Sequence, residues 1–354
     1  MIVAVTGASG NIGTAVVREL LSRGHEVRGV ARRPAGAGTN GVEWTSLDLA
    51  EPDARGALRP VFDGADAVVH TAWGFQPTRN LSYLRRLDVG GSAAVIGAAA
   101  DAGVPHLTHV SSVGAYSPGR SPAPVGEDWP TGGAAPALPY SRHKAAVERM
   151  LDAHESTGPH RPRVARIRPS LVARAEVGGS LARYVLPSLL PASLVRALPV
   201  LPLDRRFRVQ LTHSDDVAAG IVEVVERGAT GAFNLAADPV LTRADVAAAL
   251  GIPAIHLPWA ALRALAAGAW AARLQPVDPG WLDMARRVPT MSSERARREL
   301  QWEPRHDARE VLREALAGLA SGRGADTPAL RPRRWSEQLV HLLRSGPVSR
   351  RERA

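Results

Sequence analysis

Short apolar runs and longer amphipathic stretches alternate through the first half of the chain. Three stretches with helical spacing occur, at residues 11–23, 84–102 and 140–155. Runs rich in Val, Ile and Ala have the length of buried strands and separate these stretches, at residues 2–6, 26–31, 43–47, 67–71, 106–111 and 163–168. Short strands that alternate with helices of about twelve residues or more predict an α/β fold with a doubly wound parallel sheet.

The pattern changes after Pro169, where the chain becomes irregular and rich in proline. We expect residues 1–169 to form the sheet domain, with some later segments, about 205–235, returning to it. Residues 170–320 are then a smaller substrate-binding lobe over the carboxyl ends of the strands, where open α/β sheets bind ligands. Residues 321–354 are basic, and we predict that they form a flexible C-terminal tail.

A glycine-rich turn directly follows the first predicted strand and opens the first predicted helix. Gly7 permits the tight turn, Gly10 lets the backbone approach a pyrophosphate, and Gly13 lets the helix pack closely on the strand. The amino terminus of the helix offers unpaired N–H groups and a positive dipole end to phosphates. The turn therefore predicts a Rossmann-type dinucleotide site, with contacts from Gly7, Ser9, Gly10, Asn11, Ile12 and Gly13.

Arginine, rather than a carboxylate, stands at the end of the second predicted strand. An acidic residue at this place binds the 2′-hydroxyl of NAD, whereas a basic residue suits the 2′-phosphate of NADP. Arg32 and Arg33 can each hold a phosphate with two parallel hydrogen bonds, so we predict NADP, with NAD as the alternative. Asp48 and Leu49 follow the third strand and are expected beside the adenine ring, although an acidic loop residue is just as often solvated.

Lys144 is the single lysine of the chain, and the other basic residues among the 44 Lys and Arg are all arginine. It lies four residues after Tyr140, so on a helix the ammonium and the phenol share one face, one turn apart. A neighbouring cation favours the phenolate, which predicts a tyrosine pKa lowered from about 10 towards the range of a proton donor or acceptor. This pair is the best clue to chemistry in the sequence.

Three ordered motifs resemble the extended short-chain dehydrogenase/reductases, also called the NAD-dependent epimerase/dehydratase family. They are the glycine-rich turn, the segment Ser111-Ser112-Val113-Gly114-Ala115-Tyr116, and the segment from Tyr140 to Lys144. Further landmarks of the family are matched along most of the chain, at residues 66–72, 168–169, 213–218 and 292–304. The resemblance implies the fold predicted above and an NAD(P)-dependent enzyme.

The resemblance also implies a role for each residue of the site. Ser112 would hydrogen-bond the substrate carbonyl or hydroxyl, because it lies four residues before Tyr116. Tyr140 would pass the proton as hydride moves to or from nicotinamide C4, and Lys144 would hold the nicotinamide ribose. The other residues implied at the site are Thr71 and Ala72 towards the cofactor, and Trp73, Ser112 and Val113 towards the substrate.

Three departures from the family pattern bear on the reaction. Asp88 replaces an asparagine, which changes the hydrogen bonds available there and puts any proton relay through that position in doubt. Trp73 stands where the family generally has a small residue, and it either narrows the nicotinamide pocket or fills core. Val113-Gly114 stands where the family's dehydratases carry Asp-Glu, so no acid is at hand to protonate a leaving hydroxyl. Dehydration is therefore not expected.

Reduction and epimerisation are the reactions left. Reductases of the family use dissociable NADPH, which fits Arg32, whereas its epimerases mostly keep NAD tightly bound. The stretch 184–203 is rich in Leu, Val and Pro, which suits an apolar substrate or simply core packing. We predict hydride transfer between nicotinamide and a carbonyl or alcohol of a small, fairly apolar substrate, with Tyr140 as general acid/base. The alternatives are a nucleotide-sugar epimerase with tightly bound NAD and a non-catalytic NADP-binding regulatory protein.

Composition sets the remaining limits. The chain has 354 residues, a net charge of +10, a pI of about 11.1 and no cysteine. Its basic residues are scattered, so we expect a small-molecule substrate and no nucleic-acid partner. We also expect a cytoplasmic protein without membrane insertion, because the sequence begins without a basic leader and has no long apolar run. No metal site is predicted, since His106 and His109 do not form a convergent ligand set. The resemblance implies a homodimer as one option.

Overall fold

Seven parallel strands form the central sheet of the computed structural model, which describes residues 1–34, 41–74, 80–119, 123–156, 162–179, 199–275 and 277–332. The strand order is β11-β6-β5-β4-β1-β2-β3. The strands are β1 (Ile2–Thr6), β2 (Glu26–Ala31), β3 (Val42–Ser46), β4 (Ala67–His70), β5 (His106–Val110), β6 (Arg163–Pro169) and β11 (Gly231–Leu235). Because the chain reverses its direction of winding between β1 and β4, a ligand crevice is expected at their carboxyl ends. The predicted doubly wound parallel sheet is confirmed.

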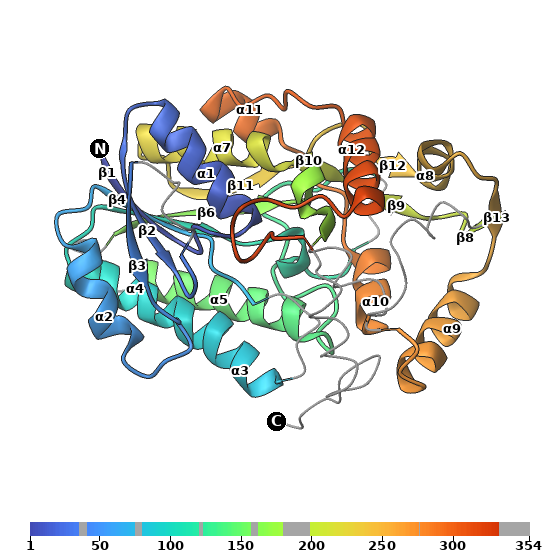
Figure 1. Ribbon diagram of the computed structural model, residues 1–354, viewed down its shortest axis with the longest axis horizontal. Helices are drawn as coiled ribbons and strands as arrows, with labels where there is room; N and C mark the ends of the chain where they lie inside the picture. Colours follow the sequence, from blue (N-terminus) through green and yellow to red (C-terminus); the bar gives the residue numbers. More distant parts are fainter. Residues whose placement is uncertain are drawn as a thin grey trace.

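Helices cover both faces of this sheet (Figure 1). One face carries α1 (Asn11–Ser22), α7 (Ser214–Arg227) and α11 (Glu294–Leu300). The opposite face carries α2 (Ala54–Phe62), α3 (Leu81–Arg85), α4 (Gly91–Asp101) and α5 (Pro139–Glu155). Alternate residues of β1 enter the two cores, since Val3 and Val5 pack under α1 and α7 whereas Ala4 packs under α2 and α4.

The structure adds three features to the predicted elements. The helix expected at residues 84–102 begins earlier, at Leu81, and a π-helical turn (Arg86–Gly90) joins α3 to α4. Helix α2 was not predicted; it is short and contains Pro60, which masks the apolar spacing of its buried face. Helix α7 and strand β11 lie in the segment 205–235 that was expected to return to the sheet domain. The exact domain boundaries stay a prediction.

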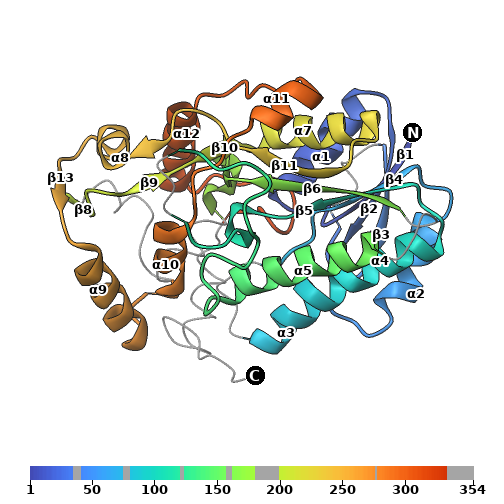
Figure 2. The same cartoon turned by 180° about the vertical axis from the view of Figure 1, so that it is seen from behind.

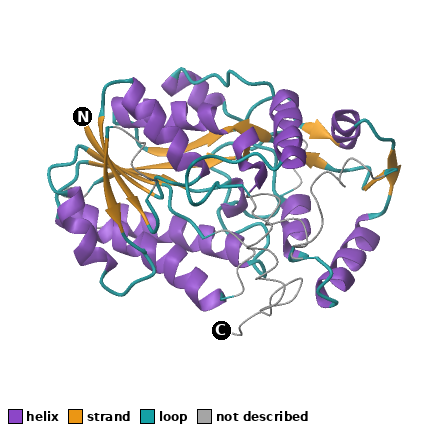
Figure 3. Cartoon of the chain, viewed as in Figure 1, coloured by secondary structure: helices purple, strands orange, loops and turns teal. Residues whose placement is uncertain are grey.

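The remaining described elements lie beside the carboxyl ends of the strands (Figures 1 and 2). Figure 3 shows that helices dominate this region and that its strands are short. The strands pair as β7 (Leu171–Ala173) with β10 (Leu211–His213), β9 (Arg208–Val209) with β12 (Leu241–Thr242), and β8 (Leu201–Leu203) with β13 (Ala254–His256). The helices are α8 (Arg243–Leu250), α9 (Trp259–Ala271), α10 (Gly280–Arg287) and α12 (Ala308–Ser321).

Two predictions fall largely outside the described residues. They concern the apolar stretch 184–203, of which residues 199–203 are described, and the basic tail, of which residues 321–332 are described. Within the described ranges, no helix has the length and apolar character needed to cross a membrane. The same ranges contain no group of three or more His, Cys, Asp or Glu side chains placed to hold a metal ion.

Candidate active site

The glycine-rich turn joins β1 to α1 at the carboxyl edge of the sheet. Gly7 has a φ of +74°, and a Cβ at this position would lie 2.5 Å from the backbone nitrogen of Ala72. A Cβ on Gly13 would lie 2.1 Å from the Gly7 carbonyl oxygen, so a larger residue there would push α1 off the turn. Since the first N–H groups of a helix have no partners within it, the turn presents an anion-binding helix terminus.

The end of β4 closes one side of this turn. The backbone N–H and the hydroxyl of Thr71 both donate to the carbonyl oxygen of Thr6, at 3.0 and 2.8 Å. Ile12 packs against the core under α1, which leaves its backbone rather than its side chain available to a phosphate. The structure thus brings together the predicted cofactor residues Gly7, Gly10, Ile12, Gly13, Thr71 and Ala72.

Asn11 was also predicted at the cofactor, but its side chain is hydrogen-bonded to other residues of the protein. Its Oδ1 accepts a hydrogen bond from the Ser214 hydroxyl at 2.8 Å, and its Nδ2 donates to the Val172 carbonyl at 3.4 Å. These bonds tie the start of α1 to α7 and β7. Of the groups of Asn11, its backbone N–H is therefore the one left for a phosphate.

The far end of the described chain lies on the same turn. The hydroxyl of Thr327 donates to the carbonyl oxygen of Ser9 at 2.9 Å, although 318 positions separate the two residues. Both residues are buried, and Thr327 belongs to the segment that follows α12. No local motif marks Thr327, so this contact could not be predicted from the sequence.

The two predicted arginines stand at the end of β2, with an unpredicted tyrosine beside them. Arg32 donates to the Tyr83 hydroxyl at 2.5 Å, and that hydroxyl donates to the Asp48 carboxylate at 2.8 Å. Burial, together with Asp48, raises the pKa of Tyr83 above its usual value, so the hydroxyl keeps the proton it donates. Arg33 is exposed, and Leu49 is buried in the core against α4. Asp48 is therefore engaged with Tyr83 rather than simply solvated.

The three predicted catalytic residues meet at the carboxyl end of β5. The Ser112 hydroxyl is hydrogen-bonded to the Tyr140 hydroxyl and accepts the Gly114 N–H at 3.0 Å. Lys144 Nζ donates to the Val110 carbonyl at 2.8 Å, one helical turn after Tyr140 on α5. Ser112 and Lys144 are buried, while Tyr140 is partly buried.

Two tryptophans flank the ring of Tyr140. Trp73, at the end of β4, approaches it edge-on with ring centres 6.1 Å apart, and Trp281 of α10 lies 5.0 Å away. The ammonium of Lys144 lies 3.3 Å from the centre of the Trp73 ring, a cation–π contact. Met284, also on α10, lies next to Gly114. Trp281 and Met284 were not predicted, because no motif marks α10 and more than 130 positions separate it from Tyr140.

Burial dominates the protonation of Tyr140 and Lys144. It raises the pKa of Tyr140 to about 12, against the Ser112 hydrogen bond that favours the phenolate. Burial also lowers the pKa of Lys144 to about 7, against the attraction of Asp88 and Glu148 for the ammonium. The predicted lowering of the tyrosine pKa was therefore wrong in direction. A phenol that stays protonated at neutral pH is suited to donate a proton.

Asp88, one of the departures from the family pattern, is buried behind Tyr140 and Lys144. Its carboxylate lies 2.8 Å from Nδ1 of His143 and accepts the Gly74 N–H at 2.7 Å. His143 was not predicted, although it sits on α5 directly before Lys144. The one sequence signal for this pair was the unusual Asp88 itself.

The chain is similar in sequence to proteins of one known family. The model of the NAD dependent epimerase/dehydratase family matches residues 3–236. A 4-hydroxy-2-methyl-3-oxo-4-farnesyl-3,4-dihydroquinoline-1-oxide ketoreductase of Stigmatella aurantiaca is 26% identical over 91% of this chain and 97% of its own length. Cinnamoyl-CoA reductase 1 of Oryza sativa subsp. japonica is 41% identical over 133 residues, which are 35% of this chain. The match spans 38% of the length of that rice reductase.

Solved structures share the fold over nearly the whole chain. A short-chain dehydrogenase/reductase superfamily protein from Agrobacterium tumefaciens, with bound NAD, is 24% identical with a TM-score of 0.66 and covers 90% of this chain and 97% of its own. The UDP-glucose 4-epimerase of Thermus thermophilus in complex with NAD is 22% identical with a TM-score of 0.64, over 90% and 99%. Since the family match runs from β1 to the end of β11, this chain belongs to the NAD-dependent epimerase/dehydratase family, the extended short-chain dehydrogenase/reductases.

Proposed function

We propose that this chain reduces a carbonyl group on a small, fairly apolar substrate, with NADPH as cofactor. The observation that carries the proposal is the Tyr140 hydroxyl, which is hydrogen-bonded to Ser112 and held protonated by burial. The nicotinamide dinucleotide, when bound, supplies the hydride. Ser112 would orient the carbonyl oxygen of the substrate, and Tyr140 would donate its proton to that oxygen as it gains negative charge.

The residues at the edge of the sheet fit a dinucleotide. At Gly7 and Gly13 the backbone is so closely packed that a Cβ would clash, and only glycine permits this tight turn. Helix α1 then offers its first N–H groups to a pyrophosphate. Arg32 and Arg33 suit the 2′-phosphate that distinguishes NADP from NAD. Lys144 would bind the nicotinamide ribose through its ammonium, which has three N–H donors and can keep its bond to the Val110 carbonyl.

The surroundings of Tyr140 support an apolar reacting group. Trp73, Trp281 and Met284 lie around Tyr140 and Gly114, and their side chains offer apolar surface to the reacting end of a substrate. The names of two relatives point the same way, since the rice protein is named a reductase and the Stigmatella protein a ketoreductase. Reduction is therefore preferred to nucleotide-sugar epimerisation for this chain.

The test is a fluorescence titration of nucleotide-stripped protein with NADPH and NADH, followed by turnover of an aromatic aldehyde and ketone panel by wild type and Tyr140→Phe. We expect tighter NADPH binding, and a loss of turnover of about 10²- to 10⁴-fold in the variant with unchanged NADPH affinity. Tyr116→Phe is the matched control, because its hydroxyl bonds Asn234 rather than Ser112.

Three other results would contradict this proposal. NAD that co-purifies and resists stripping would favour the epimerase. Equal turnover by wild type and Tyr140→Phe would remove the tyrosine from catalysis. Tight NADPH binding without turnover of any carbonyl compound, unaffected by Tyr140→Phe, would favour the regulatory protein.

A further inference from the structure

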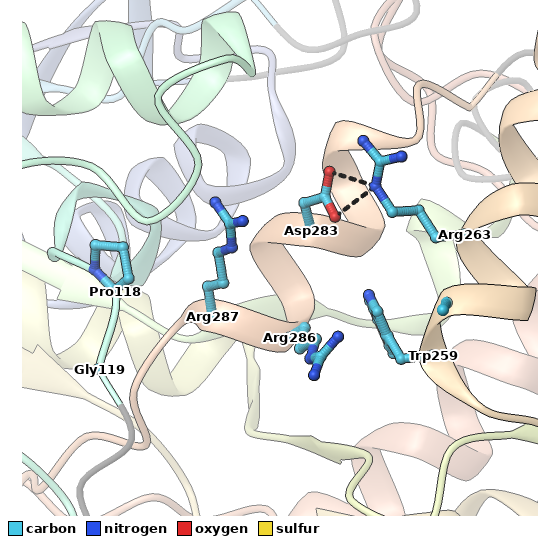
Figure 4. A pocket seen from close by; sticks show the side chains of 8 residues that line it. Pro118, Gly119, Trp259, Arg263, Asp283, Arg286 and Arg287 are labelled. Atoms are coloured by element: carbon cyan, nitrogen blue, oxygen red, sulfur yellow. Dashed lines mark hydrogen bonds and ion pairs between the residues drawn. The ribbon is translucent and has the colours of Figure 1, made fainter.

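A hollow of about 650 Å³ lies between α9 and α10 (Figure 4). Trp281 and Met284 of α10 face Tyr140 and Gly114. Because a helix turns about 100° per residue, Asp283, Arg286 and Arg287 fall on the opposite face, and these side chains line the hollow. The hollow and the catalytic hydroxyl are thus separated by one helix.

Hydrogen-bond donors outnumber acceptors in this hollow. The single carboxylate that lines it, Asp283, is already engaged, since both of its oxygens accept from Arg263 Nε at 2.9 and 3.0 Å. Trp259 is buried to 8% exposure, and its indole N–H has no hydrogen-bond partner among the described residues. Figure 4 shows this nitrogen on the side of the ring that faces α10.

Two guanidinium groups add to the surplus. Arg286 lies 5.7 Å from the centre of the Trp259 ring, and the Asp204 carboxylate, which accepts the Trp259 backbone N–H, is near enough to attract it. At the distance of an ion pair, neither Arg286 nor Arg287 has a carboxylate partner within the described part of the chain. Both arginines lie in the last turn of α10, where a positive charge is favourable. That preference accounts for their charge but leaves the buried N–H of Trp259 unpaired. An anion with several acceptor atoms would satisfy all three groups.

The hollow is also connected to the catalytic centre through the backbone. Gly119 N–H donates to the Arg287 carbonyl at 3.2 Å, which joins the end of α10 to the loop after Tyr116. The chain reaches this loop from Ser112, which lies beside Tyr140, by way of Tyr116. A ligand that bridges both places would need to span about one helix width, or 10–12 Å.

We propose that this hollow binds a carboxylate or phosphate group at the end of the substrate remote from the reacting carbonyl. This inference rests on the proposed function, and it narrows the substrate class. The substrate then has an apolar carbonyl end beside Tyr140 and an anionic end held by Trp259, Arg286 and Arg287. The anion supplies affinity and orientation, while the proton transfer stays with Tyr140.

The test uses the full chain labelled with ¹⁵N in its tryptophan side chains, with the dinucleotide site filled by NADP⁺. The indole resonance of Trp259 is assigned by its loss in Trp259→Phe. Sodium phosphate and sodium acetate are then titrated against sodium chloride at equal ionic strength. We expect a saturable shift of the Trp259 resonance, and the anion that binds more tightly identifies phosphate or carboxylate as the group recognised.

Substitution of the arginines separates a site from general charge attraction. Arg286→Gln and Arg287→Gln should each weaken the anion about tenfold, as expected for a lost charge-assisted hydrogen bond. Arg298→Gln, an exposed arginine on α11, is the matched control and should leave the affinity unchanged. A Trp259 shift that chloride reproduces, or that both hollow variants retain, would overturn the proposal. NADP⁺ affinity, measured on the same samples, is expected to be unaffected; a failure to bind NADP⁺ would contradict the proposed function instead.

Discussion

Asp88 is the residue at which this chain departs most clearly in chemistry from the pattern it resembles. A carboxylate, unlike an asparagine amide, accepts hydrogen bonds and donates none, so it needs donors or cations around it. The structure provides them in His143 and the Gly74 N–H. Its charge also raises the pKa of both Tyr140 and Lys144. This single sequence difference therefore acts together with burial on Tyr140 and against burial on Lys144.

Asp88→Asn restores the family residue and tests this effect. Removing a negative charge should lower the pKa of Tyr140, because the phenolate loses a repelling anion, and the pKa of Lys144, because the ammonium loses an attracting one. The pH at which turnover falls on the alkaline side should therefore move to lower pH. The measurement is the pH dependence of kcat for the carbonyl substrate identified by the panel.

Asp152→Asn is the control for this change. It removes an exposed carboxylate, which pairs with Arg166, from α5, the helix that carries Tyr140 and Lys144. Its pH profile should match that of wild type. An alkaline limb that stays in place in Asp88→Asn, or that moves equally in both variants, would show that Asp88 has no local influence on the pair.

Between elements, a buried polar link joins β6 to α5. Arg168 donates from Nε and Nη2 to the two oxygens of Glu148, each at 2.9 Å, and both side chains are buried. It also donates to the Tyr116 hydroxyl at 3.1 Å and to the Glu127 carbonyl at 2.8 Å. One guanidinium thus fixes α5, which carries Tyr140, and the loop after Ser112 to the same strand.

Arg168→Leu should lower the free energy of unfolding by about 3–5 kcal/mol, because it leaves the Glu148 carboxylate buried without its main partner. Urea unfolding followed by circular dichroism measures this loss. Arg227→Leu, which breaks an exposed pair with Glu223 on α7, should cost less than about 1 kcal/mol. Similar losses in the two variants would mean that the buried pair contributes no more than a surface pair.

The pH dependence of this loss follows from Glu148. Burial raises its pKa, but the hydrogen bonds and charge of Arg168 outweigh burial, so the pKa lies below its usual value. A lowered pKa in the folded state stabilises the protein above the pKa of the unfolded chain, and this stability disappears as the pH falls through the folded value. The difference between wild type and Arg168→Leu should therefore shrink below about pH 4.

The elements that sequence could predict are those with local signals. Most of the strands β1 to β6 are short apolar runs next to predicted helices, and the glycine turn has its glycines where a Cβ would clash with the backbone. Helix α2 was not predicted, because Pro60 and the polar residues of the helix obscure its apolar stripe of three residues. The π-helical turn at Arg86–Gly90 was not predicted, because the one extra residue in this turn does not change the composition of the segment.

At the scale of the whole molecule, the site is assembled from segments that no local pattern connects. Ser112, Tyr140 and Lys144 were predictable because two motifs within 33 residues contain them. Trp281 and Met284 reach the same place only because α10 packs there, and Thr327 reaches Ser9 only because the chain returns after α12. Such contacts depend on how the lobe packs on the sheet, which periodicity and composition do not encode.

The return of the chain to the glycine turn predicts that the cofactor stabilises both ends of the molecule. NADP⁺ at about one hundred times its Kd should add about 2.7 kcal/mol to the stability of any segment whose opening exposes the site. Because Thr327 bonds Ser9 directly, residues 323–331 should belong to such a segment together with residues 7–14. Hydrogen exchange with and without NADP⁺ should therefore show slower exchange in both, and little change in α8, whose described contacts lie elsewhere.

Thr327→Val separates this coupling from simple coverage by the cofactor. Valine keeps the shape of threonine but cannot donate to the Ser9 carbonyl, so the turn should stay protected by NADP⁺ while residues 323–331 lose most of their protection. If residues 323–331 exchange at the same rate with and without NADP⁺ in the wild type, the contact does not transmit the binding energy. Protection of both segments in Thr327→Val would instead mean that the cofactor itself contacts residues 323–331. The bond between Thr327 and Ser9 would then contribute nothing to their protection.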